Sequence, residues 1–173
     1  GMIALGYDRK LMAFETLIPA MLKKIDGLVN LSELEKNLLK EPLDSLRHWD
    51  FYAHSNSIAQ TLAVRWGQKI MPKVPKAIQS GGETDAVINL TNFAESGDAQ
   101  SQASALMEVI HELKQQWGTW QVKWGDMNRF QRIANEDPAV FKDEEPSLAV
   151  PFTSSAWGQL PSYTSKSFNG SKK

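Results

Sequence analysis

The chain of 173 residues contains no cysteine. Disulfide bonds, thiolate catalysis and cysteine-based zinc sites are therefore excluded. It also lacks an apolar run of about 18 residues, the length that a membrane-spanning helix needs. Neither sign of charge is in excess, because the formal net charge is −1. No global field would draw in nucleic acid or an anionic membrane, so we expect neither as a partner.

The residues that are present have ordinary proportions. Hydrophobic residues make up 42% and charged residues 23%, which is typical of a globular protein. The length allows one domain or a large part of a bigger one. The first residues, 1–7, are too short and too uncharged for a signal peptide. Gly1 before Met2 is typical of the scar of a cleaved expression tag.

Apolar residues recur at helical spacing in several parts of the chain, which predicts amphipathic helices. These stripes run over residues 11–25, 34–46, 58–70 and 103–117. Asp8 is expected to cap the first helix and Gly27 to end it. Ser32 and Glu35 form a capping-box pattern that opens the second helix. Gly118 is expected to end the last helix.

Proline and glycine interrupt this pattern. At Pro42 the second helix either kinks or gives way to a new helix that begins there. Residues 76–97 show no sustained period, so we predict a surface excursion with one short strand over 86–90. The expected fold class is mainly α, in a single incomplete domain. A helical region over 1–133 precedes a loop-rich tail over 134–173 with at most short strands, one of them at Ser147-Leu148-Ala149-Val150.

The histidines and serines do not form a recognisable site. His111-Glu112 starts like a zincin motif, but Gln115 stands where the second imidazole would have to be. His48 and His54 are six residues apart and would not share a helical face. The sequence contains no Gly-x-Ser-x-Gly and no Ser-x-x-Lys pattern. We therefore predict no metal, no cofactor and no catalytic residue in this chain.

Two aspartates stand out because each follows a tryptophan or a Trp-Gly pair. Asp50 and Asp126 are in this position, and an aspartate beside an aromatic side chain usually caps a helix or holds a backbone turn. A structural role is expected for both. The acidic run 143–145 is expected to be a solvated loop. The residues alone nominate no nucleophile, base or ligand.

One string of residues resembles a family motif. Residues 124–132, Trp-Gly-Asp-Met-Asn-Arg-Phe-Gln-Arg, are similar to the Trp-Gly-Asp-x-Asn-Arg-x-Gln-Arg segment of the β subunit of penicillin acylases. The likeness is closest to the branch of aculeacin and acyl-homoserine-lactone acylases. Upstream, residues 46–66 resemble the family's Leu-x-x-Trp-Asp, Ser-x-Ala-x-x-Leu and Trp pattern. Downstream, residues 146–151 and 154–158 are similar to the stretch that follows the Trp-Gly-Asp segment.

These enzymes are N-terminal-nucleophile hydrolases, and the resemblance implies their chemistry for a parent protein. A precursor cleaves itself, and the new N-terminal serine of the β subunit attacks an N-acyl amide with its own α-amine as base. Backbone N–H groups and an asparagine stabilise the oxyanion. This chain begins with Gly1 and lacks the family's Ser-Asn-x-Trp oxyanion segment. The resemblance therefore implies an inactive helical fragment of an amide hydrolase that cleaves N-acyl bonds.

The matched residues are expected to act as scaffold. They are Trp49, Asp50, Ser57, Trp124, Gly125, Asp126, Asn128 and Arg129. By the same resemblance, the expected partners are the remaining α and β chains of the acylase, and the parent is periplasmic or extracellular. Bare apolar helix faces also favour self-association. A self-sufficient helical interaction domain without catalysis stays open as the alternative.

Overall fold

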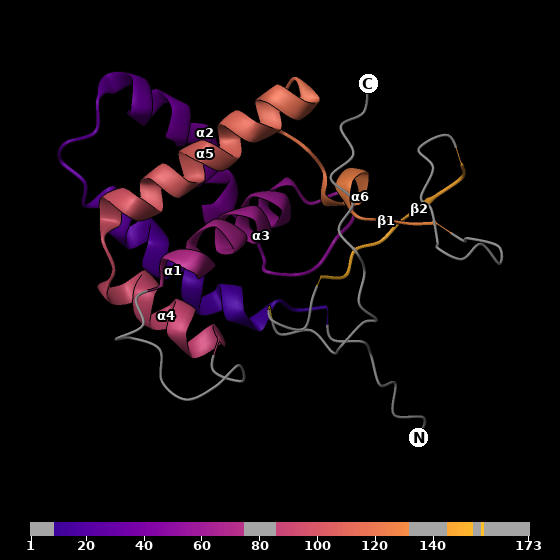
Figure 1. Cartoon of the computed structure of the whole chain (residues 1–173), viewed down its shortest axis with the longest axis horizontal. Helices are drawn as coiled ribbons and strands as arrows, with labels where there is room; N and C mark the ends of the chain where they lie inside the picture. The colour runs from indigo at the N-terminus through magenta and orange to yellow at the C-terminus, as the bar shows by residue number, and fades with distance from the viewer. Residues whose placement is uncertain (1–8, 75–85, 132–144, 154–156, 158–173) are drawn as a thin grey trace.

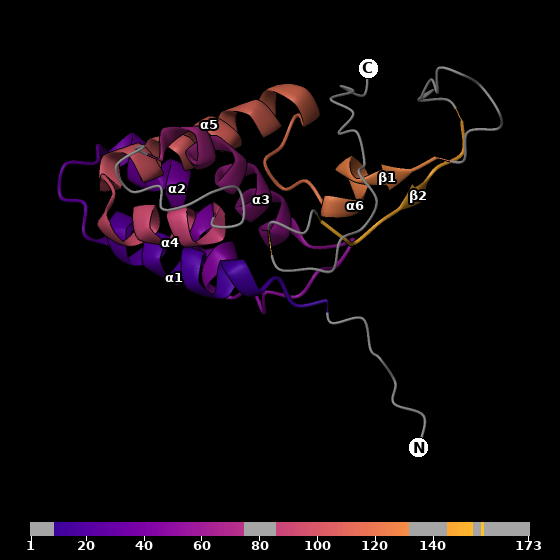
Figure 2. The same cartoon turned by 60° about the horizontal axis from the view of Figure 1, so that its bottom comes forward.

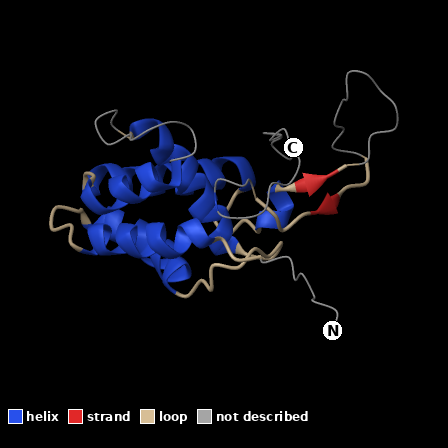
Figure 3. Ribbon diagram, turned by 90° about the horizontal axis from the view of Figure 1, so that it is seen from below, coloured by secondary structure: helices blue, strands red, loops and turns tan. Residues whose placement is uncertain are grey.

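The computed structural model describes residues 9–74, 86–131, 145–153 and 157. The fold of this part is mainly α, as the sequence predicted, with one small antiparallel sheet (Figures 1 and 3). The elements are α1 (Met12–Asp26), α2 (Glu33–Arg47), α3 (Ile58–Ile70), the 3-10 turn η1 (Met71–Lys73), α4 (Ala86–Ser96), α5 (Ala99–Trp117), α6 (Trp124–Met127), β1 (Arg129–Phe130) and β2 (Leu148–Ala149).

Four long helices build the body of the molecule. Helices α1, α2 and α5 pack on one another, α3 packs on α2 and α5, and α4 covers α1 (Figure 2). The apolar stripes predicted from the sequence face inward and form one core. Its largest fully buried side chains include Phe14, Leu17, Ile18, Leu46, Leu62, Trp66 and Leu106. Each buried side chain of this size contributes about 1.5–3 kcal/mol by leaving water.

The start of α2 is the predicted capping box. Ser32 Oγ accepts from the Glu35 N–H at 3.3 Å, and the Glu35 carboxylate accepts from the Ser32 N–H at 2.8 Å. The hydrogen bond from the Ser32 hydroxyl holds the pKa of Glu35 below its usual value. Helix α2 then runs through Pro42 as one helix, so no new helix begins there. Helix α1 follows Leu11, which gives no side-chain cap, and Asp8 lies outside the described residues.

Residues 86–96 form helix α4, so the strand predicted over 86–90 is wrong. The surface excursion is also wrong for these residues, because Leu90, Phe93 and Ala94 are buried at i, i+3, i+4 spacing. Gln102 of α5 is fully buried, and its Nε2 donates to the carbonyls of Phe93 at 3.2 Å and Ala94 at 3.3 Å. The hydrophobic periodicity of α4 is weak, so this helix is stabilised by the packing of its buried side chains and by the hydrogen bonds from the Gln102 amide. Residues 76–85 lie outside the described part.

Trp157 fills the space between α1 and α3. Its ring stacks on Phe14 with centroids 4.7 Å apart and 16° between the planes, and 2% of the residue is exposed. Gly67 provides the room, because a Cβ atom there would lie 2.4 Å from Trp157 Cη2. The predicted boundary between 133 and 134 stays a prediction. Even so, Trp157 belongs to the helical core although it comes from the predicted tail.

Ion pairs bridge the exposed sides of α3 and α5. Glu112 accepts from Arg65 at 3.0 Å and pairs with Lys69, while Glu108 lies 3.5 Å from Lys69 and 3.8 Å from Lys73. Burial alone would raise the pKa of Glu112. The hydrogen bond and charge of Lys69, with the charge of Arg65, outweigh burial and hold this pKa below its usual value. The same hydrogen bond raises the pKa of Lys69.

Replacing Glu112 with glutamine is expected to lower the free energy of unfolding by about 1–2 kcal/mol at neutral pH, because Arg65 loses its anionic partner and Lys69 keeps only Glu108. The pKa of Glu112 is lower in the folded state than its ordinary 4.5. Its contribution is therefore present above about pH 4.5 and is lost as the pH falls through the folded-state pKa. Urea unfolding at neutral and acidic pH measures this. A loss of stability in Glu112→Gln that stays the same at acidic pH would contradict this. Glu95→Gln, at an exposed position of α4, is the control.

The outer surface carries scattered large apolar side chains. The exposed ones are Met12, Val29, Leu34, Tyr52, Met71, Phe130 and Leu148, on separate elements. Phe130 and Leu148 face each other across the sheet. Self-association through an apolar helix face stays a prediction. Among the described residues, no helix has both the length and the apolar character needed to cross a bilayer.

Candidate functional site

The three segments that resemble family motifs meet at one end of the helical body, beside α6 and the sheet (Figure 1). The Trp124 N–H donates to the carbonyl of Ser57 at 3.0 Å, and the Gly125 N–H donates to the carbonyl of Ser55 at 2.7 Å. Gln60 Nε2 donates to the carbonyl of Pro151 at 2.8 Å. We call residues 54–60, 124–129 and 147–153 the three-segment junction.

The first turn of α3 supplies one side of the junction. Ser57 caps this helix, and its hydroxyl accepts from the Gln60 N–H at 3.0 Å. Gln60 is fully buried, and its Oε1 accepts from the His54 N–H at 2.9 Å while its Nε2 reaches Pro151. Gln60 therefore ties the loop before α3 to the segment after β2. Gln60 is not among the site residues predicted from the sequence, although it lies inside the matched Ser-x-Ala-x-x-Leu pattern.

Asn128 holds two carbonyls of the returning segment. Its Nδ2 donates to the carbonyl oxygens of Val150 and Phe152, each at 2.8 Å. The Val150 N–H donates back to the Asn128 carbonyl at 2.9 Å. Trp124 Nε1 adds a bond of 3.3 Å to the same Phe152 carbonyl. Without Asn128 the Val150 carbonyl would lose this donor, and the Phe152 carbonyl would keep only the longer bond from Trp124.

Arg129 fixes the start of the same segment. Its Nη2 and Nε donate to the carbonyl and hydroxyl of Ser147, both at 2.7 Å, and its Nη1 donates to the Gly125 carbonyl at 3.2 Å. Arg129 and Ala149 are also opposite each other in the sheet. In the described part of the chain this guanidinium binds only neutral oxygens. Arg129 therefore links the backbone at Gly125 to the backbone at Ser147.

Gly125 lies where two segments approach each other closely. A Cβ atom at this position would lie 2.8 Å from Ser55 Cβ, 2.9 Å from Ala149 Cβ and 2.9 Å from the Ser55 carbonyl oxygen. Real Cβ atoms essentially never have contacts this short. The glycine of the family motif is therefore required by packing.

Replacing Gly125 with alanine is expected to lower the free energy of unfolding by about 1–3 kcal/mol, because the added methyl group forces the segments apart. Urea unfolding monitored by circular dichroism measures the change. The double variant Gly125→Ala with Ala149→Gly removes one of the opposing methyl groups and should recover part of the loss. No recovery would show that the close approach to β2 is not the cause.

The two aspartates of the matched motifs have different surroundings. Asp50 Oδ1 accepts from the Tyr52 N–H at 3.0 Å, in an exposed turn. Phe51 within this turn has a φ of 64°, a conformation that is uncommon for a bulky residue. Asp126 is exposed, and its carboxylate makes no hydrogen bond or ion pair with any residue that the structure describes. Only Asp50 thus holds a backbone turn.

Trp49 connects this turn to the core. It is buried, its Nε1 donates to the Tyr52 carbonyl at 3.3 Å, and its ring lies 5.6 Å from that of Phe14. Its ring also lies 5.3 Å from that of Phe51. Trp49 therefore holds the turn against α1.

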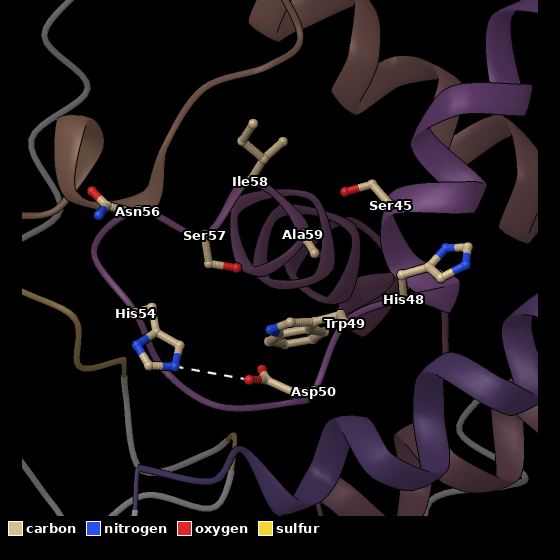
Figure 4. A pocket seen from close by; sticks show the side chains of 9 residues that line it. All are labelled: Ser45, His48, Trp49, Asp50, His54, Asn56, Ser57, Ile58 and Ala59. Carbon is tan, nitrogen blue, oxygen red and sulfur yellow. Dashed lines mark ion pairs between the residues drawn. The ribbon is translucent and has the colours of Figure 1, made fainter.

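A shallow cleft of about 430 Å³ lies between the end of α2 and the start of α3 (Figure 4). It brings together residue types that could suggest a serine hydrolase triad. His54 Nε2 lies 3.9 Å from Asp50 Oδ2, but the Ser57 hydroxyl accepts from Gln60 and points away from the imidazole (Figure 4). A triad needs a hydrogen bond from serine to histidine. The cleft therefore has no activated serine.

Metal ligands are not gathered either. Within the described residues, no group of three or more histidine, aspartate or glutamate side chains could hold a metal ion. His48 Nδ1 lies 2.8 Å from the Asp44 carbonyl, and His111 is exposed on α5. The hydrogen bonds of the motif side chains described above go mainly to backbone groups.

In the described residues the fold is a helical body, and motif side chains at one end of it hold the segment 147–153 by hydrogen bonds. The model of the penicillin amidase family matches residues 1–157, so the chain belongs to this family. It is thus an acylase-like amide hydrolase domain. No match was found among curated proteins or among solved structures.

Proposed function

We propose that the chain is the helical scaffold of an N-acyl amide hydrolase with an N-terminal nucleophile, in the branch of aculeacin and acyl-homoserine-lactone acylases. The chain by itself does not hydrolyse amides, because the nucleophile and the oxyanion donors belong to another part of the enzyme. The observation that carries this proposal is the three-segment junction. Every motif side chain that makes a hydrogen bond there is bonded to the chain's own backbone or to Ser147.

Two further features support a scaffold role. Donors that stabilise an oxyanion must point at the substrate oxygen. Both hydrogen bonds of the Asn128 amide instead go to Val150 and Phe152, so this amide is not available to a substrate. Among the residues that the structure describes, each clearly shifted pKa belongs to a cap or to the ion pairs between α3 and α5, at Glu35, Lys69 and Glu112. These three residues lie outside the three-segment junction, and structural caps and ion-pair networks also shift pKa values in this way.

The partners in this proposal are the remaining α and β chains of the acylase. The family membership and the sequence resemblance support them. A periplasmic or extracellular location of the parent follows from the same resemblance. The absence of cysteine is compatible with export and with the cytosol alike.

A self-sufficient helical interaction domain is the second candidate. The continuous core formed by α1, α2, α3 and α5 favours it, because these helices bury their apolar stripes against one another. Such a domain would unfold cooperatively as a monomer. A longer protein that contains it would not hydrolyse N-acyl amides, and this difference separates the two candidates.

The test is an assay with chromogenic N-acyl 4-nitroanilides and N-acyl homoserine lactones. The purified chain is expected to release no product above the buffer blank, whereas an acylase that includes this chain together with the remaining chains is expected to turn over. Hydrolysis by the purified chain would refute the scaffold proposal. Inactivity of the complete protein on every N-acyl amide would favour the interaction domain.

A further inference from the structure

Helix α4 lies beside α1 in the helical body (Figures 1 and 2). Among the described elements it packs mainly on α1, whereas α1, α2, α3 and α5 each pack on several of the others. Ion pairs from Arg65 and Lys69 to Glu112 also join α3 to α5. Most helix contacts of the described body therefore do not involve α4.

The sequence of α4 gives this helix little stability of its own. Asn89, Thr91 and Asn92 have low helix propensity. The first turn has no acidic residue and the last turn has no basic one, while Glu95 lies near the negative end of the helix dipole. An isolated helix of 11 residues is marginal in water. Helix α4 therefore depends on its contacts with the rest of the chain.

Gln102 of α5 supplies one of these contacts, at the end of α4. Its Nε2 donates to the carbonyls of Phe93 at 3.2 Å and Ala94 at 3.3 Å. The last carbonyls of a helix have no partner within the helix. The Phe93 carbonyl also accepts from the Gly97 N–H at 2.7 Å. The Gln102 amide therefore caps α4 from a neighbouring helix and joins its end to α5.

The oxygen of the same amide has no donor. Gln102 is fully buried, and its Oε1 accepts no hydrogen bond from any residue that the structure describes. Exchanging the two ends of the amide would not satisfy it, because the oxygen would then face the carbonyl oxygens of Phe93 and Ala94. A buried acceptor without a donor costs free energy. Moving α4 away would let water reach this oxygen, so the packed state carries a cost that an open state does not.

The start of α5 is anchored without α4. Asp98 caps α5, and its carboxylate accepts from the Ser101 N–H at 2.8 Å. Trp66 Nε1 of α3 donates to the backbone carbonyl of Gln102 at 3.2 Å. These hydrogen bonds involve no atom of α4, so they hold the first turns of α5 in place whether or not α4 is packed on them.

We propose that α4 opens as a unit away from α1 and α5 while the other long helices stay folded, and that the Gln102 amide is the latch that holds it closed. Opening uncovers the buried side chains Leu90, Phe93 and Ala94 and the side of α1 that α4 covers. An apolar surface is thereby exposed without unfolding of the body. This proposal does not depend on the catalytic identity of the parent protein.

The test uses the absence of cysteine, because one introduced thiol is then the only thiol in the full chain. Ala94→Cys in α4 and Ala63→Cys in α3 replace alanines that are both fully buried. Reaction with iodoacetamide, followed by mass spectrometry, measures how often each position is exposed. The thiol at position 94 should react at least tenfold faster than the thiol at position 63, with a weaker dependence on urea. Equal rates with equal urea dependence would overturn the proposal.

A variant in the body separates local opening from global unfolding. Glu112→Gln weakens contacts between α3 and α5, which the closed and the open state both keep. It should therefore raise the reaction rate at position 63 about fivefold or more and leave the rate at position 94 within about twofold. Equal increases at the two positions would show that α4 opens only when the whole chain unfolds, and would overturn the proposal.

A second variant tests the latch. Gln102→Glu removes the donor and places a buried carboxylate against the carbonyls of Phe93 and Ala94, so it should raise the reaction rate at position 94 at least tenfold. Circular dichroism should show that most of the helical signal is kept. The matched control, Gln100→Glu, makes the same exchange at an exposed position of α5 and should change the rate less than twofold. An unchanged rate in Gln102→Glu, or an equal increase in Gln100→Glu, would overturn the role of Gln102.

Discussion

Replacing Trp157 with alanine is expected to lower the free energy of unfolding by about 3–5 kcal/mol, the range found for large aromatic side chains in cores. Trp157 is 2% exposed, and its ring stacks on Phe14. Removing it leaves a cavity between α1 and α3 and abolishes the aromatic contact. Urea unfolding followed by circular dichroism measures the change. A loss below about 1 kcal/mol would show that Trp157 does not occupy this position in solution.

Gly67 supplies the matched partner for this experiment. Gly67→Ala alone is expected to destabilise, because the new Cβ would lie 2.4 Å from Trp157 Cη2. In the Trp157→Ala background the same change should become neutral or stabilising. The methyl group then fills part of the cavity, and alanine is favoured over glycine in a helix by about 1 kcal/mol. A double-mutant cycle thus predicts a change of sign. Additive effects would contradict the packing of Trp157 against α3.

Replacing Asn128 with aspartate is expected to lower the free energy of unfolding by about 2–4 kcal/mol. The carbonyls of Val150 and Phe152, each bonded at 2.8 Å, would lose the Asn128 donor and face a carboxylate instead, and only Phe152 would keep a second donor, Trp124 Nε1. Asn128→Ala removes the donor without adding charge and should cost about half as much. Equilibrium unfolding in urea separates the two variants.

Asp126→Asn is the control for this pair. It makes the reverse exchange between amide and carboxylate two residues away, at an exposed side chain with no hydrogen bond in the described part of the chain. The expected change is within about 0.5 kcal/mol. If Asp126→Asn lowers the free energy of unfolding as much as Asn128→Asp does, then any amide–carboxylate exchange in this motif is destabilising. In that case the loss of the two hydrogen bonds from Asn128 does not explain the effect of Asn128→Asp.

The long helices could be predicted from the sequence because each carries a sustained stripe and a clear end signal. The Ser32 capping box and the stops at Gly27 and Gly118 mark such ends, and Gly118 has the left-handed φ of 76°. Helix α4 could not be predicted in this way. Its buried positions span little more than a turn, and its fold depends on α1 and on the Gln102 amide, which come from elsewhere in the chain.

The three-segment junction could be predicted only in part, because a sequence motif identifies residues but does not show which residues they contact. Trp124, Gly125 and Asn128 were identified through the resemblance. The hydrogen bonds of Trp124 and Asn128 to Val150 and Phe152 join segments that are more than twenty residues apart. The bond from Gln60 to Pro151 spans 91 residues, and no local period can reveal such a pair. Trp157 and Gly67 were missed for the same reason, because only the folded chain brings them together.

The most direct test of the central claim, that the family motif acts as a structural brace, is amide hydrogen exchange at Val150. Its N–H donates to the Asn128 carbonyl, and its own carbonyl accepts from the Asn128 amide. We expect the Val150 amide to be protected from exchange in the unmodified chain and in Asp126→Asn. In Asn128→Ala its protection factor should fall at least tenfold, while the amides of α1 stay protected. Unchanged protection of Val150 in Asn128→Ala would contradict it.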